Sequence, residues 1–360
     1  MPSFRLIISL LCAFIMAACS TAVTSDDGAL RYARWLTLTD TTAAVLNPWR
    51  PGEVLHEYTL HDYKRAVSAT SLHAFLAYRL GATDRLAGVM DADYIVAPEL
   101  RAALTPDADM GSSQSPNLER IKAAGADLIF ASPFENAGYG SLESLGLPIV
   151  ECADYMETSP LGRAEWMRFY GRLLGRAAEA DSLFATEEAA YNTLCSASTK
   201  PAEAPSEGAT TQPTVLLGKR TGQAWYVPGG ESFMGRLLAD AGAAYTFAHE
   251  ATTGSLPLDF ETVYSSAKDA GLWLITYAAP PDADGTFAPM TYADLAAEDD
   301  RYTHFRAFRE HRIWACNTLA VPYFDTLPWA PATFLRELIA IVRPDLLPDY
   351  RLQYFHPLEP

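Results

Sequence analysis

The sequence predicts an α/β protein of two lobes, each with a parallel sheet, bridged by one long α-helix. Short apolar runs alternate with helical patterns over residues 31–158, as they do in chains that build parallel sheets. Residues 159–196 then keep a helical spacing of apolar side chains without a break. The strand-helix alternation resumes over residues 213–360. We therefore expect an N-terminal lobe, an interlobe helix and a C-terminal lobe, in that order.

The N-terminal lobe is predicted from a repeated strand-then-helix order. Gly81, Gly125 and Gly146 each end a helical pattern, as glycine commonly does. The predicted strands are 66–70, 86–90, 126–132 and 147–153, and the predicted helices are 71–81, 117–125 and 141–146.

The interlobe helix is predicted to begin at Ser159, a suitable N-cap, with Pro160 in its first turn. About 35 residues at 1.5 Å each give a helix near 50 Å long, which suggests a strut between the lobes. Residues 197–212 have no large apolar side chain, and we expect them to form a mobile loop.

The C-terminal lobe repeats the strand-helix order of the first lobe. Its predicted strands are 213–219, 272–278 and 313–317, and its predicted helices are 231–242, 258–271, 304–312 and 331–347. The pattern of residues 117–130 is echoed in 259–275: each has an apolar residue, a glutamate, a helix and a buried strand. An internal duplication and a chance likeness both remain open.

The chain begins with an apolar run, residues 6–18, which is too short to span a bilayer. It matches the core of a secretory signal. The sequence Met-Ala-Ala-Cys at residues 16–19 resembles the lipobox of bacterial lipoproteins, in which the cysteine is acylated and becomes the new N-terminus. We expect residues 1–18 to be removed, Cys19 to carry lipid and residues 19–30 to form a tether. Ordinary secretion without lipid is the alternative.

Charge and cysteine content narrow the class of protein. The chain has 27 basic and 44 acidic residues, a net charge of -17, and such a surface repels nucleic acid. Beyond Cys19, only Cys152, Cys195 and Cys316 remain, so the chain forms at most one disulfide. Whether any of them pair stays open.

Signals for catalysis are weak. His56 and His61 are five residues apart, which does not place two ligands on one helix face, and they read as surface residues of a strand. The stretch around Ser232 lacks the second glycine of a serine nucleophile elbow, because Met234 occupies that position. No phosphate-binding glycine loop stands between a strand and a helix. We expect a protein that is not an enzyme and needs no cofactor.

The whole order of motifs resembles the class III substrate-binding proteins of ABC importers, the receptors for ferric siderophores, haem and cobalamin. The resemblance rests on five stretches: SLHAFLAYRLGATDRLAGV, NLERIKAAGADLIFASPFENA, SPLGRAEWMRFYGRLLG, SFMGRLLADAGA and the closing segment from IWACNT to RPDLLP. It implies two Rossmann-like lobes with a largely pre-formed cleft between them. It also implies a monomer that captures a metal chelate, with an ABC permease and ATPase as partners, at the periplasmic face of a bacterial membrane.

The cleft of such a protein is expected at the carboxyl ends of the strands, where open α/β sheets bind ligands. We expect hydroxyl, aromatic and charged side chains from these loops to hold the ligand. Aromatic rings would stack on a chelate, and Arg220 would pair with its negative charge. The candidate ligand-binding residues are Thr70, Ser71, Tyr94, Phe134, Glu135, Arg220, Trp225, Tyr226, Thr276 and Tyr277.

The resemblance also implies one glutamate on each lobe that docks onto the permease. Glu119, in NLERI, matches the family pattern in the first lobe. The second lobe departs from it, since Arg236 stands where a glutamate is favoured, and Glu231 or Asp240 is the candidate substitute.

Three alternatives stay open. A receptor of the same architecture for free zinc or manganese would need three or four His or carboxylate ligands in the cleft. An extracytoplasmic metal-dependent hydrolase would need a cluster of titratable groups there, and Asp91, Asp93 and Glu135 keep this possibility open. A purely structural lipoprotein would need no cleft. The sequence does not choose between siderophore, haem and cobalamin.

Overall fold

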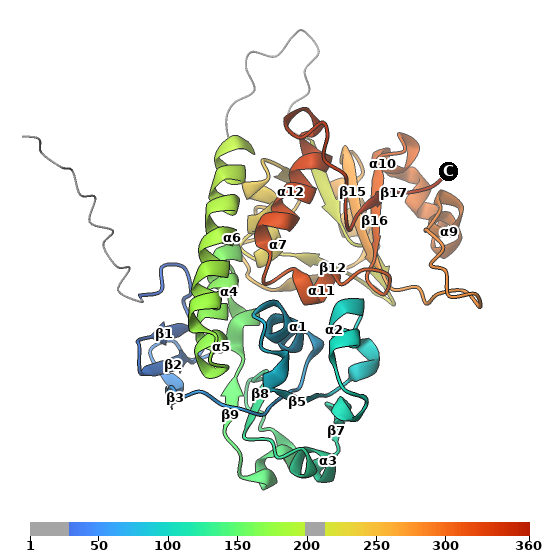
Figure 1. Ribbon diagram of the computed structural model, residues 1–360. Coiled ribbons are helices and arrows are strands. Elements are labelled where there is room, and N and C mark those ends of the chain that lie inside the picture. The colour runs from blue at the N-terminus through green and yellow to red at the C-terminus, as the bar shows by residue number, and fades with distance from the viewer. Residues whose placement is uncertain (1–28, 199–212) are drawn as a thin grey trace, which may run out of the picture.

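The computed structural model describes residues 29–198 and 213–360. It shows the predicted two α/β lobes, one above the other, with a helical connection along one side (Figure 1). The predicted lipidation site, Cys19, and most of the predicted mobile loop lie outside the described residues.

The N-terminal lobe is built on a parallel sheet with strand order β5-β4-β8-β9. Alternate side chains face opposite sides of this sheet. Ala66 and Phe130 join the core under α1, while Val67 and Ile129 join a second cluster with Ile121 of α3. The elements are α1 (Ser71–Arg79), α2 (Pro98–Ala103), α3 (Leu118–Ala123), β4 (Ala66–Ser68), β5 (Leu86–Val89), β8 (Leu128–Ala131) and β9 (Ile149–Glu151).

The C-terminal lobe has a five-stranded sheet with order β13-β10-β15-β16-β17, in which only β17 is antiparallel. Its strands are β10 (Thr214–Leu217), β13 (Ala244–Tyr245), β15 (Leu272–Tyr277), β16 (Ile313–Asn317) and β17 (His356–Pro357). Its helices are α7 (Phe233–Asp240), α8 (Phe260–Ala267), α9 (Tyr292–Glu298), α10 (Arg306–Arg309), α11 (Tyr323–Thr326) and α12 (Pro331–Val342).

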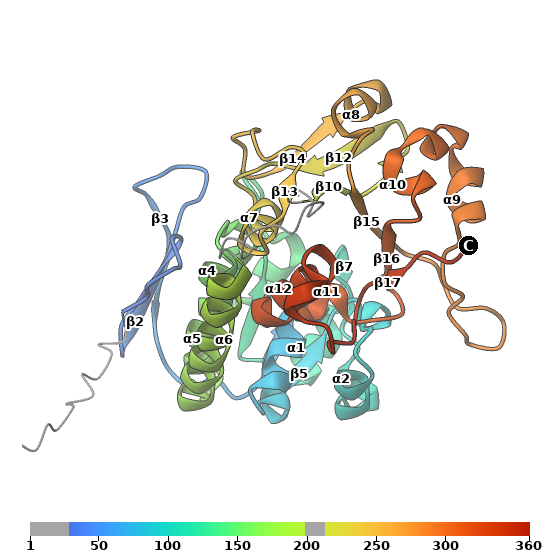
Figure 2. The ribbon, with the colours of Figure 1, turned by 90° about the horizontal axis from the view of Figure 1, so that it is seen from above.

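Three small antiparallel sheets complete the fold. The first stands on the outer side of the helical connection, away from both lobe sheets (Figures 1 and 2). It contains the strand that bears His56, whereas His61, predicted on the same strand, lies beyond its end. The strands are β1 (Leu36–Leu38), β2 (Thr42–Leu46) and β3 (Val54–Thr59) in this sheet; β11 (Arg220–Thr221), β12 (Ala224–Pro228) and β14 (Ser255–Leu258) in the second; and β6 (Gly111–Ser112) and β7 (Ser115–Pro116) in the third.

Short 3₁₀ turns link many of these elements. They are η1 (Thr83–Arg85), η2 (Ala92–Tyr94), η3 (Pro106–Ala108), η4 (Gly140–Leu145), η5 (Ala153–Met156), η6 (Asp300–His304) and η7 (Pro344–Leu346).

The helical connection differs from the predicted single rod. It consists of α4 (Pro160–Glu165), α5 (Met167–Leu173) and α6 (Ala177–Ser198), and α5 packs alongside α6 (Figures 1 and 2). Gly175 lies in the left-handed region with φ +65°, where glycine ends a helix at little cost and lets the chain turn back. The sequence pattern concealed this turn, because both arms keep an apolar face toward the same cores.

Helix α6 still bridges the two lobes. Its 22 residues span about 33 Å. Phe184 belongs to the core of the N-terminal lobe, whereas Tyr191 and Leu194 belong to the core of the C-terminal lobe. One rigid helix is therefore part of both cores, which restricts motion of one lobe against the other.

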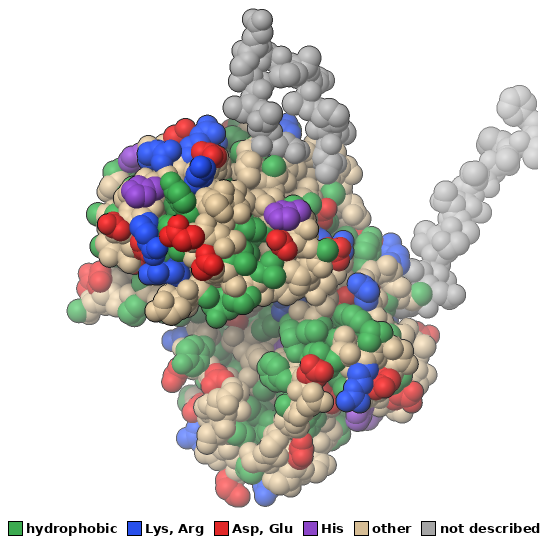
Figure 3. All heavy atoms as spheres, turned by 180° about the vertical axis from the view of Figure 1, so that it is seen from behind, with side chains coloured by type: hydrophobic (Ala, Val, Ile, Leu, Met, Phe, Trp, Pro, Cys, Tyr) green, Lys and Arg blue, Asp and Glu red, His purple; other side chains and the backbone are tan. Residues whose placement is uncertain are grey.

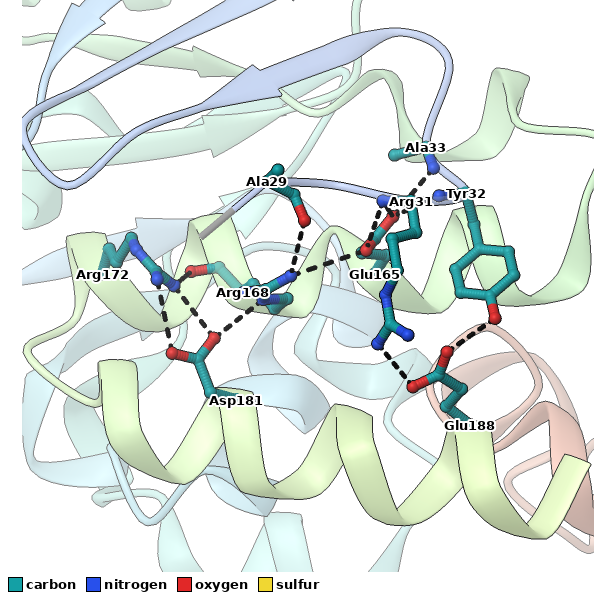
Figure 4. A network of polar contacts seen from close by, with 9 residues as sticks. All are labelled: Ala29, Arg31, Tyr32, Ala33, Glu165, Arg168, Arg172, Asp181 and Glu188. Atoms are coloured by element: carbon teal, nitrogen blue, oxygen red, sulfur yellow. Dashed lines mark hydrogen bonds and ion pairs between the residues drawn. The ribbon is translucent and has the colours of Figure 1, made fainter. Parts of the chain in front are cut away.

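The chain that enters the N-terminal lobe is fixed to this helical connection (Figure 4). The carboxylate of Glu165, a fully buried residue on α4, accepts backbone N–H bonds from Arg31, Tyr32 and Ala33 at 2.8–3.1 Å. Glu188 on α6 accepts the Tyr32 hydroxyl at 2.6 Å.

Candidate functional site

The strand orders place a crevice at the same end of both lobe sheets. Crossovers leave in opposite directions between β4 and β8 and between β10 and β15, which makes these the switch points where α/β sheets bind ligands. The loop after β4 touches the segment after β16, because the Ser71 hydroxyl donates to Asp325 at 2.5 Å. The carboxyl ends of the two sheets therefore face each other. Figure 3 shows a groove between the lobes with hydrophobic side chains along both edges.

Four exposed aromatic residues lie after the parallel strands of the two sheets or close to their carboxyl ends. Tyr94 is 70% exposed, Phe134 65%, Tyr226 54% and Phe324 62%. Tyr94 and Phe134 come after β5 and β8 in one lobe, and Tyr226 and Phe324 lie on β12 and on α11 in the other. Large apolar groups left in water near a crevice are typical of a ligand or partner surface. Phe324 was missed from the sequence, although it follows the last parallel strand, and the strand-end rule applied to β16 would have found it.

Two pockets lie at the strand ends of the C-terminal lobe. One, with a volume of about 140 Å³, is lined by Tyr226, Thr276, Met234 and Tyr323 among others. The other lies beside it along the sheet and is lined by Tyr277 and Phe287 among others. The Tyr277 hydroxyl already accepts the backbone N–H of Met290 at 3.1 Å, so this ring is held in place. Thr276, Tyr277 and Tyr226 remain candidate ligand residues, as do Glu135 and Phe134 in the other lobe, both of which are exposed.

The hydroxyl groups of Thr70 and Ser71 both form hydrogen bonds within the protein. Thr70 is the N-cap of α1, and its hydroxyl also lies 2.8 Å from Nδ1 of His73. The hydroxyl of Ser71 is committed to Asp325. Both hydroxyls serve the helix end and the contact between lobes, and a role of these two residues in ligand binding stays a prediction.

Behind Thr70 lies a buried polar cluster centred on Asp154. Its carboxylate contacts Nε2 of His73 at 2.8 Å, the Tyr170 hydroxyl at 2.8 Å and Nε of Arg163 at 3.3 Å. Burial opposes ionisation of Asp154, but His73 and Arg163 outweigh it and hold the pKa of the carboxyl below its usual value. Trp329 packs against His73 and donates from Nε1 to the Leu72 carbonyl at 3.0 Å. The cluster fixes α1 and the contact between lobes.

Trp225 is a core residue, and its burial gives no support to its predicted role in the ligand site. Its side chain is fully buried, stacked on Trp273 at 5.7 Å, and its Nε1–H donates to the Leu217 carbonyl at 2.9 Å. Strand β12 alternates, so the neighbouring Tyr226 faces outward while Trp225 faces the core.

Arg220 is less available than predicted. Its guanidinium lies 3.3 Å from the carboxylate of Asp299, which also binds Arg301 at 2.7 Å. The hydrogen bond from Arg301 holds the pKa of Asp299 below its usual value. Arg220 is thus already paired within its own lobe.

The candidate docking glutamates are exposed. Glu119 is the second residue of α3 and its side chain is 89% exposed. Glu231 is exposed ahead of α7 and stays a prediction. Asp240 is a weaker substitute, because it accepts the Tyr191 hydroxyl at 2.6 Å.

The sequence similarity between residues 117–130 and 259–275 points to a further candidate docking glutamate, Glu261. It is the second residue of α8, after the N-cap Asp259, just as Glu119 follows the N-cap Asn117 in α3. Each helix leads into a central strand of its sheet, β8 or β15. The Glu261 side chain is 78% exposed. Sequence reasoning noted the echo but did not transfer the docking role along it.

Within residues 29–198 and 213–360, no group of three or more His, Cys, Asp or Glu side chains is arranged to hold a metal ion. A free-metal receptor thus finds no ligand set in that part of the chain. In the same residues, no helix has the length and apolar content needed to cross a bilayer. Cys152 and Cys316 lie in the cores of different lobes and form no disulfide with each other.

A two-lobed α/β body with an aromatic groove between its lobes defines a class of binding protein. A family model described as periplasmic binding protein matches residues 67–318. The chain belongs to this family, and the predicted family and class III fold are confirmed.

Individual relatives are distant. The chain is 28% identical over 174 residues to an uncharacterized lipoprotein of Methanocaldococcus jannaschii, which covers 46% of this chain and 39% of the relative. The chain thus spans about two fifths of the length of that relative.

Solved structures share the fold. A periplasmic haem-binding protein from Pseudomonas aeruginosa has a TM-score of 0.56 at 21% identity, over 78% of this chain and 93% of that one. A molybdate-binding protein, MolA of Haemophilus influenzae, has a TM-score of 0.59 at 16% identity, over 82% and 90%. Relatives of one fold thus bind unlike ligands, and the fold alone does not choose among them.

Proposed function

We propose that this chain is the lipid-anchored, extracytoplasmic receptor of an ABC importer, and that it captures one metal chelate and passes it unchanged to the permease. The observation that carries the proposal is the set of exposed aromatics, two from each lobe, at the groove. Rings of this kind stack on the flat or lobed surface of a large chelate. The lipoprotein relative and the sequence of residues 16–19 support the anchor.

The connection between lobes suits such a receptor. Helix α6 is part of both cores, and the Ser71–Asp325 and Trp329–Leu72 hydrogen bonds join the lobes. A groove that is already formed loses less free energy to ordering when the ligand arrives. Glu119 and Glu261, at matching places in the two lobes, are the proposed contacts to the permease.

A thermal-shift screen of the full soluble chain tests this function. Ferric siderophores, haem and cyanocobalamin are each added at increasing concentration. A true ligand at 100 times its dissociation constant stabilises the protein by about 2.7 kcal/mol, which raises Tm by several degrees. If no member of the panel shifts Tm, the ligand class is wrong.

A further inference from the structure

We propose that the groove selects a neutral or positively charged chelate and discriminates against anionic ones. This inference rests on the proposed function and names its substrate class. It starts from the segments that follow the parallel strands of both sheets, here called the strand-end segments. They are residues 69–71, 90–97, 132–139, 152–159, 218–223, 246–254, 278–290 and 318–330.

The strand-end segments are rich in acidic and poor in basic residues. Lys219 and Arg220 are their only lysine and arginine. Their exposed carboxylates include Asp93 and Glu135 in the first lobe and Asp282 and Asp284 in the second. Asp93 and Glu135 are both exposed, and neither forms an ion pair within 4.0 Å among the described residues.

The basic groups near the groove are already engaged. Lys219 forms an ion pair with Glu298, and Arg220 lies 3.3 Å from Asp299. The exposed His249 lies beside Glu250, with Nε2 at 3.3 Å from the carboxylate.

Two arginines adjoin the first lobe's segments. Arg163 on α4 lies 3.3 Å from the carboxylate of Asp154, which belongs to one of these segments. Arg101 on α2 directs its guanidinium to the backbone carbonyl of Ile95. The described residues thus offer no pair of arginines that converge on the groove as a fork for a carboxylate.

An anionic chelate would meet the wrong electrostatics here. Recognition of carboxylates or of a trianionic iron centre normally uses free arginine or lysine groups. The strand-end segments instead carry exposed carboxylates, on a chain of net charge -17. Its potential concentrates cations and repels anions. The fitting ligands are an uncharged or cationic ferric trishydroxamate, or a corrinoid without ionised carboxylates. A ferric triscatecholate, with charge −3, and haem, with two carboxylates, do not fit.

Equilibrium titration of the full soluble chain tests this charge selection. The probes are ferric desferrioxamine B, which is cationic, cyanocobalamin, ferric enterobactin and haem. We expect a neutral or cationic probe to bind at least about tenfold more tightly than either anionic one, a difference of about 1.4 kcal/mol. Tighter binding of an anionic probe overturns the charge selection and leaves the receptor function standing. Binding of none overturns both.

Salt and charge-neutralising variants give a second readout. Added NaCl screens charges between exposed groups, so affinity for the cationic probe should fall as ionic strength rises. The double variant Asp93→Asn/Glu135→Gln should lower the affinity for the cationic probe by about tenfold. The difference in affinity between the cationic and the anionic probes should therefore become smaller. Glu57→Gln, an exposed carboxylate on β3 outside the groove, is the matched control and should leave every affinity unchanged. Equal effects of the double variant and the control would contradict the proposal.

Discussion

Ser71 in the N-terminal lobe donates its hydroxyl proton to the carboxylate of Asp325 in the C-terminal lobe, at 2.5 Å across the meeting point of the two sheets. Asp325 is buried. One short polar contact thus joins the two lobes where the segments after β4 and β16 meet. Two predictions about stability follow from this pair.

Ser71→Ala should destabilise the protein by about 1–3 kcal/mol, because the buried carboxylate of Asp325 loses a hydrogen-bond donor that water does not replace. Urea denaturation measures the loss. Ser141→Ala, at an exposed position in η4, is the control and should change stability by less than about 0.5 kcal/mol. A loss no larger than that of the control would show that the hydroxyl is not needed between the lobes.

Asp325→Asn should stabilise the protein, increasingly so as pH rises. Burial raises the pKa of Asp325, while the bond from Ser71 lowers it in part. The unfolded carboxyl ionises near pH 3.9, whereas the folded one ionises only at higher pH. The folded state therefore holds the proton longer, and wild-type stability falls as pH climbs between these two pKa values.

The asparagine side chain does not ionise in this pH range, and its amide oxygen can still accept the hydrogen bond from the Ser71 hydroxyl. Unfolding by urea at a series of pH values from 4 to 8 should show the advantage of the variant appear above about pH 4 and then level off. An advantage that is constant with pH, or largest at acid pH, would contradict the assignment.

Trp225→Phe should lower stability by about 1–3 kcal/mol, since it removes a buried indole and its hydrogen bond to Leu217. Ligand affinity should stay within about twofold, because the ring does not reach the groove. Tyr226→Ala, at the exposed next position, should have the opposite effect. Ligand affinity should fall, whereas Tm should not change. Chemical denaturation and titration of both variants separate the two roles, and a large affinity loss in Trp225→Phe would restore it to the site.

Glu119→Gln and Glu261→Gln should impair delivery without impairing capture. If these residues dock onto the permease, ligand-dependent ATPase activity of the reconstituted importer should drop by about tenfold in the double variant. Chelate affinity should not change. Glu231→Gln, exposed ahead of α7, tests the other prediction for the second lobe. Loss of activity in Glu231→Gln but not in Glu261→Gln would assign docking to the loop before α7.

The sequence was enough to predict the two lobes and most of their strands, because buried parallel strands and glycine-terminated helices leave strong local patterns. It did not reveal the turn at Gly175, since both arms of the helical connection keep one apolar face and only the backbone conformation shows the reversal. Trp225 was misplaced for a related reason. A one-residue shift along β12 exchanges core and surface, and nothing local fixes which ring faces in.

The predicted ligand site stays a prediction. The strand-end rule found Tyr94, Phe134 and Tyr226, which are all exposed. It did not show that Ser71 and Arg220 were already engaged, because their partners Asp325 and Asp299 are far away in sequence. Contacts of that range depend on the tertiary fold.

The most direct test of the account is a double-mutant cycle across the groove, with Phe134→Ala, Tyr226→Ala and their combination titrated with the chelate that the wild type binds. We expect one-to-one binding, a loss of about 0.5–1.5 kcal/mol for each single variant, and unchanged Tm without ligand. Val54→Ala, which is exposed on β3, should have no effect. Binding that survives both substitutions undiminished would place the ligand elsewhere and contradict a receptor that holds its cargo between the lobes.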